Sequence, residues 1–105
     1  GKRNLQDVKD YIDMHFTEKI MLDDLSERFF INKYYLTRIF REQFGMPISQ
    51  YIMQLRITHA KRNLRFTALS MEEIAVECGL EDANYFSRVF RKVEGVSPGE
   101  YRKQW

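Results

Sequence analysis

The sequence predicts an all-α fold of seven helices, in which two similar halves are joined by one long helix. Apolar residues recur at three- and four-residue steps, which is the period of an amphipathic helix. Only two prolines and five glycines interrupt the 105 residues. The chain also matches itself at an offset of about 50 residues, as repeated structural units do.

The first three helices are expected over residues 4–16, 22–29 and 33–44. Asn4 suits the N-cap position of the first helix. The apolar stripe of that helix consists of Leu5, Val8, Ile12 and Phe16. The third helix should end at Gly45, because glycine readily adopts the left-handed conformation that follows a helix.

A longer helix is expected over residues 48–66, and it is apolar on two sides. One stripe consists of Ile48, Ile52 and Leu55, and the other consists of Met53, Ile57, Ala60 and Leu64. A helix that is apolar on two sides must be covered on two sides. This segment therefore suits a linker helix shared by two small helical bundles.

Three further helices follow the linker helix. The first begins after Ser70, whose spacing to Glu73 makes a capping box. The second spans residues 83–94 and ends at Gly95. The last opens with three start signals in succession: Ser97, Pro98 and Glu100.

The internal repeat is clearest where residues 36–41 (LTRIFR) align with residues 86–91 (FSRVFR). The same offset pairs Gly45 with Gly95, Tyr51 with Tyr101, and Asn32 with Asp82. Further upstream the offset is one residue shorter, so that residues 25–26 align with residues 74–75. Matched caps, glycines and arginines indicate that the chain contains one module twice.

Each copy is predicted to be a helix-turn-helix motif, because a short helix, a tight turn and a second helix follow one another. In the second copy Ala75 is small where the helices cross, and Gly79 suits a turn that needs positive φ. The first copy has Ser26 and Phe30 at these places. The fold is therefore predicted as a homeodomain-like pair within one domain (1–105), with a first subdomain (4–46), a linker helix (47–66) and a second subdomain (67–105).

The outer face of the second helix in each motif is where contacts to a DNA duplex are expected, because such a helix enters the major groove. In the first motif this face consists of Lys33, Tyr34, Thr37, Arg38 and Arg41. In the second motif it consists of Ala83, Asn84, Ser87, Arg88 and Arg91. The opposite stripes are expected to be buried: Leu36, Ile39, Phe40 and Phe44 in one helix, and Phe86, Val89, Phe90 and Val93 in the other.

Side-chain chemistry assigns a role to each of these residues. Arg38 and Arg88 can each bind guanine O6 and N7, and Asn84 can bind adenine. Contacts to thymine methyl groups are expected from Tyr34, Thr37 and Ala83, and contacts to phosphate from Lys33, Arg41 and Arg91. Amides at the start of each motif's first helix are expected to hold phosphate as well. A linker of about 18 residues is about 27 Å long, which suits recognition helices about 34 Å apart in successive major grooves.

The net charge is only +2, but the charges are unevenly distributed. Residues 4–30 contain seven acidic and three basic residues, whereas residues 32–66 contain seven basic and one acidic residue. This split predicts a polarised molecule with one side suited to phosphate. No apolar run reaches the roughly 18 residues of a membrane span. The single cysteine fits a reducing compartment, and the cytoplasm is the expected location.

The sequence predicts no enzyme activity, no metal site and no cofactor. His15 and His59 lack companions at ligand spacing. Cys78 falls on an apolar face and has no partnered base that would make it a nucleophile.

The sequence resembles the C-terminal domain of the AraC/XylS family of bacterial transcription regulators. The resemblance rests on residues 70–75 (SMEEIA), 79–82 (GLED), 85–92 (YFSRVFRK), 95–102 (GVSPGEYR) and 35–41 (YLTRIFR). It implies a seven-helix domain that binds promoter DNA and usually activates transcription through contact with RNA polymerase. It also implies a further N-terminal sensing or receiver domain in the full regulator.

Three residues depart from the family pattern in the first motif. Phe30 replaces the usual small turn residue, and Tyr34 and Tyr35 make an aromatic entry to the recognition helix. Two other functions are compatible with such a helical chain, namely a protein-interaction module and a structured-RNA binder. Salt-dependent duplex binding distinguishes the first, because counterion release accompanies phosphate contacts. Competition between DNA and RNA distinguishes the second, because an A-form major groove does not admit a recognition helix.

Overall fold

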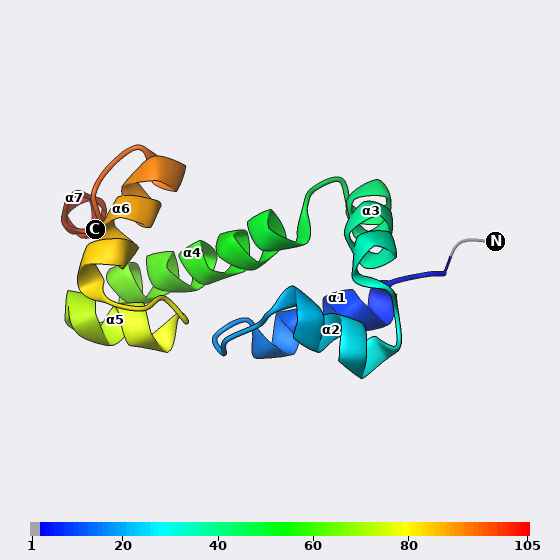
Figure 1. The fold of residues 1–105 in the computed structure, drawn as a ribbon. Coiled ribbons are helices and arrows are strands. Elements are labelled where there is room, and N and C mark those ends of the chain that lie inside the picture. The colour runs from blue at the N-terminus through cyan, green and yellow to red at the C-terminus, as the bar shows by residue number, and fades with distance from the viewer. Residues whose placement is uncertain (1–2) are drawn as a thin grey trace. The chain divides into compact units, whose positions relative to one another are not determined.

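The computed structural model describes residues 3–105, and over that range it contains seven α-helices and no strand (Figure 1). The helices are α1 (Gln6–His15), α2 (Leu22–Phe29), α3 (Lys33–Phe44), α4 (Ile48–Phe66), α5 (Met71–Glu77), α6 (Ala83–Glu94) and α7 (Pro98–Lys103). The predicted all-α fold is confirmed. The predicted bounds of α2, α3, α4 and α6 are confirmed as well.

Helix α1 is shorter than predicted, and Leu5 rather than Asn4 occupies its N-cap position. The Asn4 side chain still accepts a hydrogen bond from the Gln6 amide, at 2.9 Å. The chain enters the helix at Leu5 because that side chain is fully buried and its amide donates to the Gln43 side chain of α3, at 2.8 Å. At the other end, Phe16 is the C-cap residue and lies outside the helix.

The chain forms two compact units, one ending at Met53 and the other beginning at Gln54, so the boundary lies inside α4. The core of the first unit includes Leu5, Val8, Ile12, Leu25, Leu36, Ile39, Phe40, Ile48 and Ile52. The core of the second unit includes Ile57, Ala60, Leu64, Ile74, Ala75, Cys78, Leu80, Phe86 and Phe90. Each half of α4 therefore supplies buried side chains to a different unit, which explains the two apolar stripes in its sequence.

The repeat extends further toward the N-terminus than the sequence comparison predicted. The residues of α1 and its N-cap that are buried at three- and four-residue steps are Leu5, Val8 and Ile12. The second half of α4 has buried residues at the same steps, namely Ile57, Ala60 and Leu64. In each unit, a helix with this burial pattern precedes the helix-turn-helix motif.

Six side chains of the predicted apolar stripes are less buried than expected: Phe16, Phe44, Met53, Leu55 and Val89 are only partly buried, and Val93 is exposed. Val93 is 48% exposed, because the rings of Phe86 and Phe90 fill the core and Val93 lies beyond them in the last turn of α6. Leu55 is only partly buried, because it lies next to the boundary between the two units.

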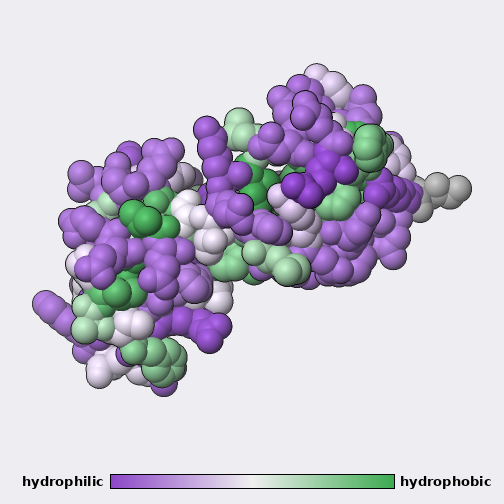
Figure 2. Space-filling view, turned by 90° about the horizontal axis from the view of Figure 1, so that it is seen from below, coloured by the Kyte–Doolittle hydropathy of each residue, from purple (hydrophilic) through white to green (hydrophobic). Residues whose placement is uncertain are grey.

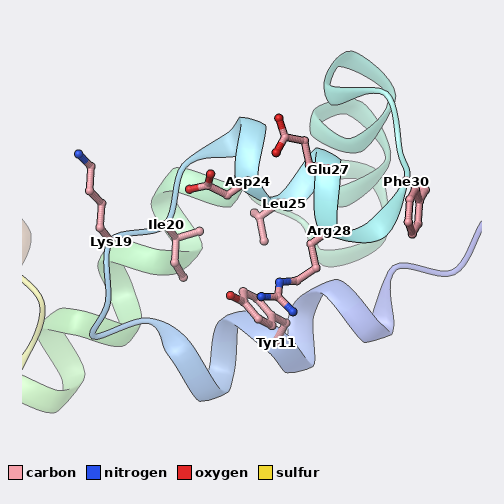
Figure 3. Close-up of a pocket in the computed structure, with 8 residues that line it drawn as sticks. All are labelled: Tyr11, Lys19, Ile20, Asp24, Leu25, Glu27, Arg28 and Phe30. Carbon is pink, nitrogen blue, oxygen red and sulfur yellow. The ribbon is translucent and has the colours of Figure 1, made fainter.

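The turns of the two motifs are built alike, although their residues differ. In each, an amide beyond the turn donates to a carbonyl of the preceding helix, that of Ser26 at 3.0 Å and that of Ala75 at 2.8 Å. Each turn also contains one residue in the left-handed region, Phe30 with φ 55° and Gly79 with φ 87°. Phe30 is 94% exposed, and its ring points away from the other labelled side chains in Figure 3.

Hydrophilic residues cover most of the face drawn in Figure 2, and hydrophobic side chains gather there in small separate patches. Among the helices of residues 3–105, none is both long and apolar enough to cross a membrane.

Candidate nucleic-acid interface

The second helix of each motif begins and ends in the same way. The Asn32 side chain accepts hydrogen bonds from the first-turn amides of α3, and the Asp82 side chain accepts one from the Tyr85 amide of α6, at 2.8 Å. Both helices have 12 residues, and both end at a glycine in the left-handed region, Gly45 with φ 81° and Gly95 with φ 84°. The local sequence therefore sets two recognition helices of equal length.

All ten predicted contact residues are exposed or partly exposed. On α3 the exposed ones are Tyr34, Thr37, Arg38 and Arg41, and Lys33 is partly exposed. On α6 the exposed ones are Asn84, Arg88 and Arg91, and Ala83 and Ser87 are partly exposed. Each set of five lies on the outer face of its own helix, opposite buried phenylalanines. The two sets belong to different units.

The two arginines predicted to bind guanine each lie over the ring of a tyrosine three residues earlier in the same helix. The Arg38 guanidinium lies 5.6 Å from the centre of the Tyr35 ring, and the Arg88 guanidinium lies 5.7 Å from the centre of the Tyr85 ring. A cation–π contact of this kind restricts the long arginine side chain. Arg38 also lies 3.8 Å from the Glu42 carboxylate in an exposed ion pair, whereas Lys92 stands at the matching position after Arg88. Sequence reasoning missed this role of the two tyrosines, although the shared three-residue spacing was a signal for it.

Several other contact residues are held by weak surface interactions. Lys33 Nζ lies 3.5 Å from the Asp23 carboxylate, and Arg91 lies 3.7 Å from the Glu100 carboxylate. Such exposed ion pairs contribute little to stability, so either cation can exchange its partner for a phosphate. The Thr37 hydroxyl donates to the Lys33 carbonyl at 2.9 Å, which leaves its methyl group and its oxygen lone pairs for an outside ligand.

A groove runs beside the outer face of α3. One side consists of residues at the start of α2, and the other consists of side chains of α3. Its apolar surface comes from Met21, Leu22 and Tyr34, which are 50%, 37% and 75% exposed. The sequence analysis did not include Met21 or Leu22 among the contact residues.

The starts of α2 and α5 carry acidic residues. Asp23 and Asp24 lie in the first turn of α2, and Glu72 and Glu73 in the first turn of α5. The Ser70 side chain also accepts a hydrogen bond from the Glu73 amide, at 3.1 Å. Carboxylates at a helix start compensate the helix dipole and repel phosphate. Phosphate binding by these amides stays a prediction, and the charges oppose it.

A second hollow lies between α1 and α2 (Figure 3). There the Arg28 guanidinium lies 4.5 Å from the centre of the Tyr11 ring. Asp24 and Glu27 also line this hollow, together with Lys19. Because two basic and two acidic residues line the hollow, their charges balance and do not favour a polyanion.

The residues considered for catalysis are not assembled into a site. Within residues 3–105 no cluster of three or more histidine, cysteine or acidic residues can hold a metal ion. Cys78 is buried, and burial raises the pKa of its thiol to about 11. The thiol is therefore protonated at neutral pH and is a poor nucleophile.

Comparison with known proteins matches this chain to a helix-turn-helix family and to a transcriptional activator. A family model described as a helix-turn-helix domain matches residues 25–104. The HTH-type transcriptional activator RhaR of Cronobacter sakazakii is 53% identical over 70 residues, which cover 67% of this chain and 25% of RhaR. This chain thus spans about a quarter of the length of that relative.

Two solved structures are similar in fold and in sequence. One is the DNA-binding domain of AdpA, a global transcriptional factor, in complex with a target DNA, with TM-score 0.89, 27% identity, and coverage of 95% of this chain and 90% of AdpA. The other is a transcriptional regulator with an AraC-type DNA-binding domain from Chromobacterium violaceum, with TM-score 0.84 and 26% identity. The match covers 95% of this chain and 89% of that regulator's chain.

Proposed function

Because the chain belongs to the AraC-type family of helix-turn-helix domains, we propose that it binds double-stranded promoter DNA sequence-specifically and regulates transcription. The observation that carries this proposal is the repeated arrangement on α3 and α6, where an exposed arginine is stacked on a tyrosine of the same helix. The target DNA held by the similar AdpA domain supports the proposal.

In this proposal the two recognition helices enter successive major grooves and bind base edges with their first halves. Arg38 and Arg88 each make two hydrogen bonds to a guanine, and Asn84 makes two to an adenine. Tyr34, Thr37, Ala83 and Ser87 make the remaining contacts to base edges. Lys33, Arg41 and Arg91 bind phosphate and fix the register of the helices on the duplex.

The proposed role is binding rather than catalysis, in the bacterial cytoplasm and without a cofactor. We infer that the full regulator contains an N-terminal sensing or receiver domain, since the chain covers about a quarter of RhaR. We also infer that the regulator contacts RNA polymerase as an activator, since RhaR is named a transcriptional activator.

Selection of binding sites from random duplex DNA with the purified chain tests the proposal. We expect a site of about two helical turns with two separated blocks of preferred bases, and retention that weakens steeply with salt. One block alone contradicts base contacts by both motifs. No enrichment and no salt-dependent retention contradict DNA binding and favour a protein-interaction module.

A further inference from the structure

The groove beside α3 contains an apolar surface that the core does not use. Met21 and Leu22, at the start of α2, form one side of it, and Tyr34 of α3 lies on the other. Lys33 of α3 also lies 3.5 Å from the Asp23 carboxylate of α2, so the starts of the two helices lie close together. An apolar surface is thus held next to the half of the recognition helix that is closest to the bases.

Met21 occupies a position where another residue would stabilise the fold better. It is the N-cap residue of α2, and a thioether is a weak hydrogen-bond acceptor. Serine and threonine are strongly preferred at this position. The second motif has Ser70 there, which accepts a hydrogen bond from the Glu73 amide at 3.1 Å. The Met21 amide donates to the Asp24 carboxylate at 3.3 Å, but the half-exposed Met21 side chain makes no cap hydrogen bond, so it is available for contact with a ligand.

The rim of the groove indicates which ligand fits. Lys33, Arg38 and Arg41 line it beside the apolar side chains, so it suits a polyanion that carries apolar groups. Duplex DNA has that chemistry, because the C5-methyl group of thymine is the apolar group exposed on base edges in the major groove. Charge complementarity and apolar contact therefore point to one ligand.

We propose that Met21 and Leu22, together with Tyr34, form a contact surface for thymine methyl groups and make the first motif selective for thymine. This proposal rests on the proposed DNA-binding function and deepens it. The second motif retains only part of this surface, since Ser70 replaces Met21 and Asn84 replaces Tyr34, while Met71 stands in the place of Leu22. The first motif thus selects its bases largely by methyl contacts, and the second by hydrogen bonds.

Replacement of thymidine by deoxyuridine tests the proposal, because it removes only the methyl group. Each thymidine of the selected site is replaced in turn, and Kd is measured by fluorescence anisotropy. The block bound by the first motif is identified as the one whose base preference Arg38→Ala relaxes. For the wild-type chain we expect about a fourfold weaker Kd at one or more positions of that block, from the lost burial of one methyl group. Replacements in the other block should have smaller effects.

The variant Met21→Ser/Leu22→Ala then assigns the effect to the groove. Met21→Ser restores the cap that Ser70 provides in the second motif, so folding is maintained. We expect this variant to lose the discrimination at the position that Met21 and Leu22 contact, whereas Tyr34 and Thr37 keep any methyl contacts of their own. The variant Leu22→Met, which introduces the residue found at the matching position 71, keeps an apolar side chain and should keep the discrimination.

Three results overturn the proposal while leaving the proposed function intact. They are a first block without thymine, a wild-type Kd that is the same for thymidine and deoxyuridine, and discrimination that is undiminished at every position of the block in Met21→Ser/Leu22→Ala. An equal loss of affinity on both kinds of site in that variant also overturns it, since it indicates contacts to sugars. Absence of any sequence preference in the wild-type chain overturns the proposed function itself.

Discussion

Phe30 and Gly79 occupy the same place in the two helix-turn-helix motifs and share the left-handed backbone conformation, with φ values of 55° and 87°. Glycine adopts this conformation without cost, whereas a side chain brings Cβ close to the following carbonyl. The Phe30 side chain is 94% exposed, so its burial offsets little of that conformational strain. The first turn is therefore the more strained of the two.

Phe30→Gly should raise the free energy of unfolding by about 1 kcal/mol, because it removes the strain at positive φ. Urea denaturation monitored by circular dichroism measures the change. Phe30→Ala serves as the control, because alanine keeps the strained Cβ while losing the exposed ring. If Phe30→Ala stabilises the chain as much as Phe30→Gly, backbone strain is not the cause.

Arg102→Ala should lower the free energy of unfolding of the second unit. The guanidinium donates to the carbonyls of Leu64 at 3.0 Å and Leu69 at 2.8 Å, and so satisfies one acceptor in the last turn of α4 and one in the segment that follows it. Hydrogen bonds from a charged group contribute about 1.5–3 kcal/mol. Thermal unfolding of the variant measures the loss.

Two variants test whether the geometry of Arg102 matters. Arg102→Lys should not restore stability, because an ammonium group lacks the planar fork that reaches several carbonyls. Lys103→Ala, at an exposed neighbour in α7, should leave stability nearly unchanged. Full rescue by lysine would show that charge alone, and not the fork, stabilises the end of α4.

Leu64→Ala should destabilise the chain more than Leu55→Ala. Leu64 is 2% exposed, and truncation of a buried leucine costs about 2–5 kcal/mol. Leu55 is only partly buried, so its truncation should cost less, contrary to what its place in an apolar stripe predicted. Urea denaturation of both variants compares their free energies of unfolding directly. An equal decrease would mean that the Leu55 side chain is fully buried in solution.

Local sequence signals predicted the helices, whereas contacts between distant residues could not be predicted. Asn32 and Asp82 cap helices through amides two or three residues away, so neighbouring residue types were sufficient. Arg102 binds a carbonyl 38 residues away in the sequence, and no local pattern indicates that pairing. The apolar stripes of α4 predicted that it is covered on two sides, but not that Leu55 lies outside both cores.

The candidate site was predicted only in part, because its residues on a single helix follow a local pattern whereas its residues from different helices do not. Helical periodicity placed Arg38 and Arg88 on exposed faces, and the structure agrees. Met21 and Leu22 were missed, because their place in the groove depends on how α2 packs against α3. Side-chain spacing along one helix carries no information about such packing.

Stability should decrease above about pH 9 in a way that depends on Cys78. Burial raises the pKa of its thiol from 9.0 to about 11, so the folded state binds the proton more tightly than the unfolded state. This contribution to stability is complete below the unfolded pKa and is lost as pH rises through the folded one. Urea denaturation of the wild type and of Cys78→Ala between about pH 8 and pH 11 measures it.

The comparison with Cys78→Ala isolates the thiol, because Tyr51 and Lys9, whose pKa values are also raised, are present in both proteins. The wild type should lose more stability than the variant over this range. If the free energy of unfolding of the two proteins changes with pH in parallel, the thiol has the same pKa in the folded and the unfolded state.

Base contacts and phosphate contacts should respond differently to substitution. Arg38→Ala and Arg88→Ala should each weaken binding to the selected site by about 1–3 kcal/mol and relax the preference at one base position. Lys33→Ala should weaken binding to selected and random DNA alike and reduce the salt slope by about one, because one phosphate contact is lost. Titrations at several salt concentrations, on selected and random duplexes, distinguish these outcomes. Equal losses on both duplexes for the two arginines would assign them to phosphate. In that case the contact between each guanidinium and its tyrosine would hold a positive charge near the DNA phosphates, and the guanidinium would not make paired hydrogen bonds to guanine.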